Sequence, residues 1–159
     1  MGYIVLTIAA VILTVIFTRG RWQHLVSVKM RHLPLLAIGI GLQVLASATD
    51  AAFGPSTSRW ISAYLISALI LIAFCAMNRP KTWMLVVSCG IAFNAIAVGA
   101  NQGMPTRTPD GRGPIVTTAK HRPAESSDRV VLLTDIIWIP APASTMISLG
   151  DLMISVGVC

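Results

Sequence analysis

The residues of this sequence that could do chemistry gather in its last third. Lys120-His121-Arg122 is a basic triplet that could bind an anionic head group or a phosphate. His121 could also act as a general base near neutral pH, although no serine or cysteine is visibly paired with it in the sequence. Glu125 and Asp128 follow closely and balance the charge, so a solvated cluster without function is the competing interpretation.

A second group of polar residues marks the start of the final apolar stretch. Ser148-Leu149-Gly150-Asp151 has the pattern of a capping box, with a serine at the helix start and an acid three residues later. The helix dipole favours an acid at that place. If the helix instead began near Ala143, Asp151 would lie deeper in a membrane and could be a proton or cation site. Asp135 is the other acid flanked by apolar residues.

Two amides, Gln43 and Asn94, stand within long apolar runs, each about 15 Å along its predicted helix. The simpler interpretation is that each bonds to a neighbouring helix, a contribution of about 0.6 kcal/mol. The alternative is that they line a path through a membrane. None of the first four apolar runs has an ionisable residue clearly at its centre, which disfavours a proton-coupled pump or a voltage sensor.

The elements that must position these residues are those of a membrane protein. Of the 159 residues, 55% are apolar and 11% are charged, against roughly 25% charged residues in soluble domains. Apolar runs of about the length that crosses a hydrocarbon core cover residues 2–18, 33–52, 60–77 and 83–100. The last stretch, 144–159, is a short or truncated fifth span. Small residues suited to close helix packing are Gly39 and Gly41, Ala63 and Ser67, and Ala95 and Gly99.

The predicted fold is therefore all-α: a polytopic membrane helix bundle with four full transmembrane helices plus a short or truncated fifth, in a single domain over residues 1–159. Residues 101–143 are predicted to be a long extracytoplasmic loop, rich in Pro, Gly, Thr and charge. Loops of that length are more often functional or disordered than simple connections. Within it, Val130 to Ile139 is apolar again and could lie at the interface or pack onto the bundle.

Basic residues predict the orientation. Short loops rich in Lys and Arg stay in the cytoplasm, and the two such gaps, which have no acid, contain Arg19, Arg21, Lys29, Arg31, Arg79 and Lys81. The N-terminus and the long loop are thus expected outside, with the C-terminal end toward the cytoplasm. Aromatic residues at membrane interfaces are represented by Trp22, Trp60, Trp83 and Trp138, all beside span ends.

Other functional classes are disfavoured by composition. The net charge of +6 comes largely from the short gaps between apolar runs, so a nucleic-acid partner is not expected. Cys75 and Cys89 lie within apolar runs, where cysteine behaves as a small hydrophobe. Since no Cys/His ligand spacing is present, no metal site is expected, and no cofactor is expected either.

The motifs of the last third resemble those of a family of small bacterial inner-membrane proteins classed only as a domain of unknown function. They are Asn101-x-Gly103-Met104-Pro105, Lys120-His121, Leu133-x-Asp135-Ile136-Ile137 and Ser148-x-Gly150-Asp151. The resemblance implies four to five spans and a final helix that continues beyond the Ser-x-Gly-Asp start, so that this chain stops early. It also implies residence in the bacterial cytoplasmic membrane. The family has two glycines where this sequence has Gln102-Gly103. No activity follows from the resemblance.

Three functions are compatible with these residues. The first is a non-enzymatic bundle with a polar extracytoplasmic site that binds a lipid head group or a partner protein. Its candidate residues are Asn101, Met104, Lys120, His121, Asp135, Ser148 and Asp151. The second is a small oligomeric transporter or channel, with a path lined by Gln43, Asn94 and Asp151. The third is a membrane enzyme that acts on a lipid-linked substrate, with His121 and either Asp135 or Asp151 as acid and base. Membrane lipids, a protein partner or further copies of the chain are the expected partners.

Overall fold

The computed structural model describes residues 30–53, 57–107, 120–140 and 145–158. The predicted span at residues 2–18 and Trp22 lie outside the described residues. Three long helices occur where apolar runs predict them: α3 covers Leu33–Phe53, α4 covers Thr57–Met77 and α5 covers Thr82–Asn101. Within the described part of the chain, Ser58–Met77 and Thr82–Asn101 are long and apolar enough to cross a membrane.

Polar turns separate these helices. The Asn78 side chain is 1% exposed and accepts the backbone N–H of Arg31 at 2.9 Å, while its amide nitrogen donates to the Arg31 and Phe74 carbonyls. This one side chain therefore ties the start of α3 to the end of α4. At the far end of α5, Gln102 has φ 51° and ψ 44°, the left-handed conformation that closes many helices. A residue other than glycine pays about 1–2 kcal/mol for that conformation.

The all-α prediction is wrong for the segment between α5 and the final helix. Four three-residue strands occur in the described part of this segment: β1 (Met104–Thr106), β2 (His121–Pro123), β3 (Ile137–Ile139) and β4 (Thr145–Ile147). β1 and β2 are parallel, whereas β3 and β4 are antiparallel. Strands this short carry no readable alternation of polar and apolar residues, which is why periodicity could not find them.

The final helix, α6, covers Leu149–Val158. The prediction that a helical stretch begins at residue 144 is wrong, because Thr145–Ile147 forms β4 and α6 starts only at Leu149. Between Asp128 and β3, a short 3₁₀ helix, η2, covers Val131–Leu133. Within residues 130–139, Leu133 packs against the buried core cluster of the bundle, whereas Leu132 is 76% exposed.

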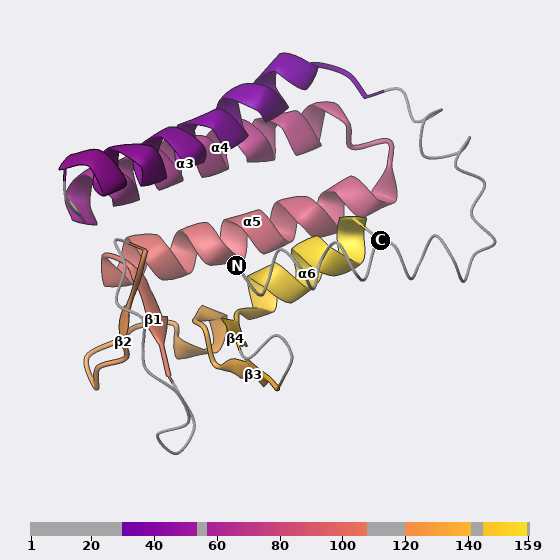
Figure 1. Ribbon diagram of the computed structural model, residues 1–159. Coiled ribbons are helices and arrows are strands. Elements are labelled where there is room, and N and C mark those ends of the chain that lie inside the picture. The colour runs from indigo at the N-terminus through magenta and orange to yellow at the C-terminus, as the bar shows by residue number, and fades with distance from the viewer. Residues whose placement is uncertain (1–29, 54–56, 108–119, 141–144, 159) are drawn as a thin grey trace.

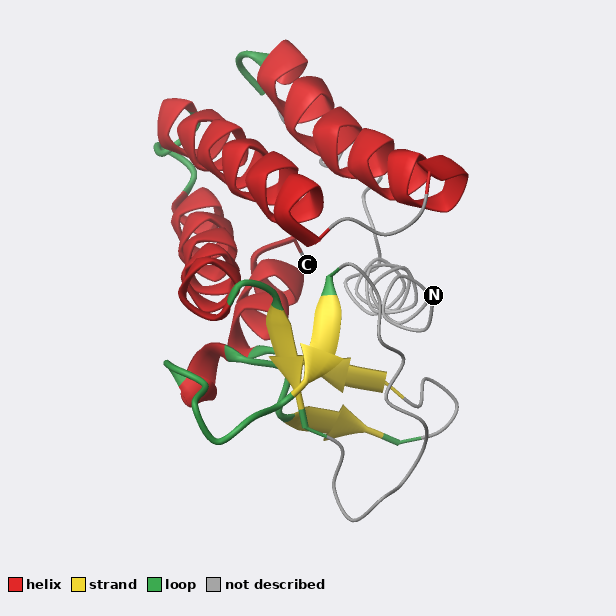
Figure 2. Ribbon diagram, turned by 90° about the vertical axis from the view of Figure 1, so that its left-hand side faces the viewer, coloured by secondary structure: helices red, strands yellow, loops and turns green. Residues whose placement is uncertain are grey.

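The helices form two pairs that lie on each other (Figure 1). α3 lies along α4, α4 also contacts α5, and α5 lies along α6. The strands gather together below the helices (Figure 2), at the end of the bundle where α5 finishes (Figure 1).

The core joins α3, α4, α5 and β1. Its buried members are Ala46, Trp60, Tyr64, Ala97, Val98 and Met104. The rings of Trp60 and Tyr64 stack with centroids 5.0 Å apart. Trp60 is only 5% exposed, so it is a core residue and not the interfacial aromatic that its position suggested. A second cluster, around Phe74 and Met84, occupies the opposite end, where an apolar cavity of about 790 Å³ lies between the helices.

Candidate functional site

Three of the sequence motifs meet beside β1. β1 pairs with β2 on one side, so that Met104 is opposite His121. On its other side Thr106 forms a bridge with Asp135, whose N–H donates to the Pro105 carbonyl at 3.1 Å. Backbone hydrogen bonds thus hold residues that are far apart in sequence side by side. This pairing fixes the backbone positions from which their side chains extend.

The side chains of His121 and Asp135 form an ion pair. His121 Nε2 lies 3.3 Å from Asp135 Oδ2. The Asp135 side chain is 2% exposed, whereas that of His121 is 33% exposed. The other carboxylate oxygen, Asp135 Oδ1, is buried without a hydrogen-bond donor among the described residues. A buried carboxylate beside a half-buried histidine could accept a hydrogen bond from a ligand, or orient the imidazole as a general base.

Asn101 holds the loop that leads from this pair back toward the bundle. Its side-chain amide donates to the Ala97 and Arg129 carbonyls, and its side-chain oxygen accepts the Arg129 N–H at 2.7 Å. Its own carbonyl accepts both Nε and Nη2 of Arg122. Met104 is completely buried. Both candidates therefore position the site in this structure and do not line it.

We expect Asn101→Ala to loosen residues 120–130 without unfolding the helices. The substitution removes two hydrogen bonds that link α5 to Arg129 and one to the Ala97 carbonyl within α5, each worth about 1 kcal/mol. Hydrogen exchange should become at least tenfold faster at Arg129 and its neighbours while α4 stays protected. Gln102→Ala, at an exposed neighbouring position, is the control. Unchanged exchange at Arg129 would contradict this role of Asn101.

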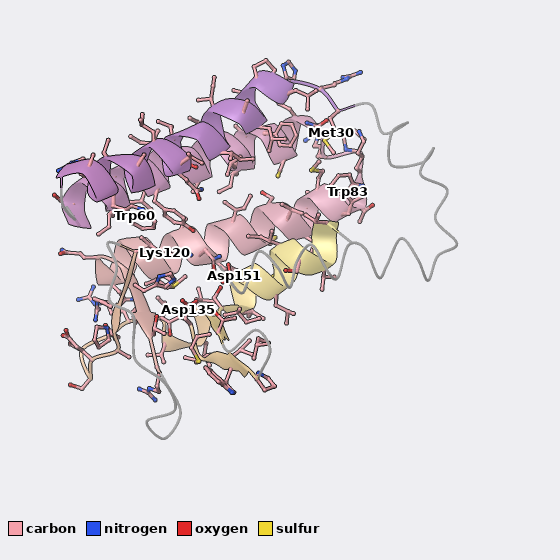
Figure 3. The ribbon with its side chains drawn as sticks, viewed as in Figure 1. Met30, Trp60, Trp83, Lys120, Asp135 and Asp151 are labelled. Carbon is pink, nitrogen blue, oxygen red and sulfur yellow. The ribbon has the colours of Figure 1, made fainter. Side chains whose placement is uncertain are left out.

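The three residues of the basic triplet, Lys120, His121 and Arg122, make different contacts. Arg122 forms ion pairs with Asp128 and Glu125, as the charge-balanced interpretation predicts. Lys120 lies next to the end of α5, beside the polar residues at this end of the bundle (Figure 3), and its carbonyl accepts the Met104 N–H at 2.8 Å. Lys120 and His121 are both partly exposed, so they are the residues of the triplet that remain at the rim of the site.

The start of α6 is a capping box, as the sequence predicts. Ser148 Oγ accepts the Asp151 N–H at 3.0 Å, and Asp151 Oδ2 accepts the Ser148 N–H at 3.3 Å. Asn94 of α5 completes the arrangement, because its amide nitrogen donates to Asp151 Oδ1 and its oxygen accepts the Ser148 hydroxyl, both at 2.7 Å. The two amides found in the sequence thus bond across helices, Asn94 here and Gln43 to Ser67 at 2.9 Å.

Gln43 and Asn94 belong to different helix pairs. Gln43 lies between α3 and α4, where Ser67 also donates to the Gly39 carbonyl. Asn94 lies between α5 and α6. The described structure therefore places them in two separate polar contacts, which does not favour the single path proposed for a transporter.

Glycines allow α5 and α6 to approach this closely. A Cβ on Gly150 would lie 2.6 Å from the Gly90 carbonyl and would overlap the Asn94 side chain. A Cβ on Gly157 would lie 2.6 Å from the Val87 side chain. The crossing is consequently a backbone-to-backbone contact of the kind that small residues permit between membrane helices.

Tyr64 is a site residue that the sequence does not reveal. It is 8% exposed in α4 and interacts electrostatically with both Asp151 and Asp135. It is therefore close to both the capping box and the His121–Asp135 pair. Figure 3 shows both carboxylates below α5, with Asp135 nearer than Asp151 to the end of the bundle where Trp60 lies. Within the described residues, no three His, Cys, Asp or Glu side chains come together as a metal site would require.

Fold and site together define a mostly helical protein with helices of membrane-spanning length, capped at one end by short strands that enclose a buried acid. The chain belongs to the family of unknown function DUF5317, whose model matches residues 27–159. This confirms the resemblance to an uncharacterised family. Searches of curated proteins and of solved structures gave no match.

Proposed function

We propose that this chain is an integral membrane protein in which α3, α4 and α5 cross the bilayer. A helix of 20 residues rises about 30 Å, the thickness of a hydrocarbon core. The outward residues of α3 and α4 support this placement, since a soluble helix rarely leaves so many large apolar side chains exposed. Those between 51% and 68% exposed are Leu33, Ile38, Ile40, Val44, Leu45, Ile66 and Leu69.

The proposed orientation puts the strands outside the cytoplasmic membrane of a bacterium. Arg31, Arg79 and Lys81 lie at the end of the bundle opposite to the strands, next to the turn between α4 and α5. Positive residues in short connections favour the cytoplasm. If the predicted span at residues 2–18 also crosses the membrane, the N-terminus is outside; the C-terminal end points inward.

This orientation sets the depth of the polar contacts. Asn94 lies seven residues before the end of α5 at Asn101, which places it about 10 Å below that end. Because Ser148 and Asp151 bond to Asn94, the start of α6 lies at the same depth. Irregular backbone is tolerated there only when protein or water covers it. Asp151 is then a helix cap and an intramembrane carboxylate at once.

The function that this geometry supports best is binding of a phospholipid head group at the outer end of the bundle. The observation that carries the proposal is Asp135, a buried carboxylate whose Oδ1 has no donor within the described residues. An exposed apolar turn precedes it, in which Leu132 is 76% exposed and Val130 43% exposed. This turn would enter the lipid while Lys120 and His121 face the head groups.

We expect Asp135→Asn to remove bound lipid without unfolding the chain. The full protein, extracted gently from its own membranes, is examined by native mass spectrometry. The amount of phospholipid bound to the variant should be lower than in the wild type by a factor of about ten or more, as the loss of a hydrogen bond to a charged group implies. Glu125→Gln removes a charge from the same loop at a side chain that is 67% exposed, and should bind as the wild type does. A stoichiometric protein partner in place of lipid would overturn the proposal.

A further inference from the structure

We infer that Asp135 receives the ammonium group of an aminophospholipid, an inference that rests on the head-group binding proposed above. The Asp135 carboxylate is nearly completely buried, and one of its oxygens is already engaged by His121. The other oxygen has no donor among the described residues. Buried polar atoms are almost always hydrogen-bonded, so a donor from outside the described protein completes this site.

The charge of the Asp135 carboxylate itself favours a cationic donor. A hydrogen bond from an ammonium group to a carboxylate is stronger than one from a neutral hydroxyl. A quaternary ammonium has no N–H and could not satisfy Oδ1.

The rim of the site carries the opposite charge. Lys120, directly before β2, and His121, its first residue, are partly exposed, and Arg122 beside them forms ion pairs with Asp128 and Glu125. A head group that combines a phosphate with a primary ammonium therefore matches the site, with the ammonium inside at Asp135 and the phosphate outside at Lys120. The apolar turn around Leu132 lies on the same segment and suits the beginning of the acyl chains.

The test uses lipids that differ only in their N–H donors. Dioleoyl phosphatidylethanolamine, its N-methyl and N,N-dimethyl derivatives and phosphatidylcholine have the same net charge but three, two, one and no N–H groups. The full chain in nanodiscs of each lipid is competed against phosphatidylcholine, and bound lipid is counted by native mass spectrometry. We expect a preference for phosphatidylethanolamine of about tenfold or more, as a charged hydrogen bond provides, retained by the dimethyl lipid and lost with phosphatidylcholine.

Variants connect this preference to one carboxylate. Asp135→Asn should reduce the preference to below about twofold, whereas Glu125→Gln should keep it. The wild-type series remains decisive if Asp135→Asn fails to fold. Equal retention of phosphatidylethanolamine and phosphatidylcholine by the wild type would overturn the ammonium assignment, although head-group binding would stand. A preference for phosphatidylglycerol would overturn it in favour of a hydroxyl donor. Failure to retain any lipid would overturn both proposals.

Discussion

Gly150→Ala is expected to lower the stability of the protein by about 3 kcal/mol, the upper end of what overpacking costs. In an ordinary helix the same change would stabilise by roughly 1 kcal/mol, because alanine is the better helix former. Here the added methyl would overlap the Asn94 side chain and lie 2.6 Å from the Gly90 carbonyl. The Gly90 backbone cannot move unless α6 moves away from α5. The steric clash therefore outweighs the gain in helix propensity, and the variant is less stable than the wild type.

A thermal unfolding assay of the detergent-solubilised chain measures this effect. The apparent midpoint should fall by on the order of 10 °C. Gly41→Ala is the matched control, since its Cβ would meet nothing within 4 Å in α3, and it should unfold at or slightly above the wild-type temperature. If both variants unfold together, the close crossing of α5 and α6 does not exist in the protein.

Asn94→Ala is expected to have an effect of similar size, about 2–4 kcal/mol. The substitution removes the donor to Asp151 Oδ1 and the acceptor for the Ser148 hydroxyl. Ser148 is completely buried, and a buried group that loses its partner costs more than the hydrogen bond itself contributes. The loss of support for a buried carboxylate adds to this cost.

Gln43→Ala is the control for this prediction because it removes an amide contact between two other helices, α3 and α4. Its cost should be near the average of about 0.6 kcal/mol for membrane hydrogen bonds. The measurement compares the thermal unfolding midpoints of the two variants. Cysteine labelling at the start of α6 then shows whether that end of the helix has become more accessible. Equal midpoints for Asn94→Ala and Gln43→Ala would mean that the capping box does not depend on α5.

The helices could be predicted from sequence because apolar length is a strong signal. α3, α4 and α5 all occur where apolar runs predict them, and the Ser148–Asp151 capping box is present as expected. The Ser67 position chosen for close packing does lie against the Gly39 backbone. The α5–α6 crossing, however, uses Gly90, Gly150 and Gly157, none of which was predicted to be a packing position.

The site was only partly predictable, because its assembly depends on contacts between distant residues. His121 and Asp135 stand out in sequence as unusual polar residues, but their pairing depends on strands of three residues that leave no periodic pattern. The sequence also does not show how deep in the membrane a residue such as Asp151 lies. A cap and a deep acid seemed to be alternatives for Asp151, yet both hold in the proposed membrane placement, because α6 begins opposite Asn94.

The separation of 54 residues between Asn94 and Ser148 also bears on the order in which the protein can assemble. α4 and α5 are joined by the short turn at Asn78–Lys81, so they can pair as soon as they are synthesised. Closing the long loop costs more chain entropy and is slower. The contact between α6 and Asn94 is therefore expected to form after α4 and α5 have paired.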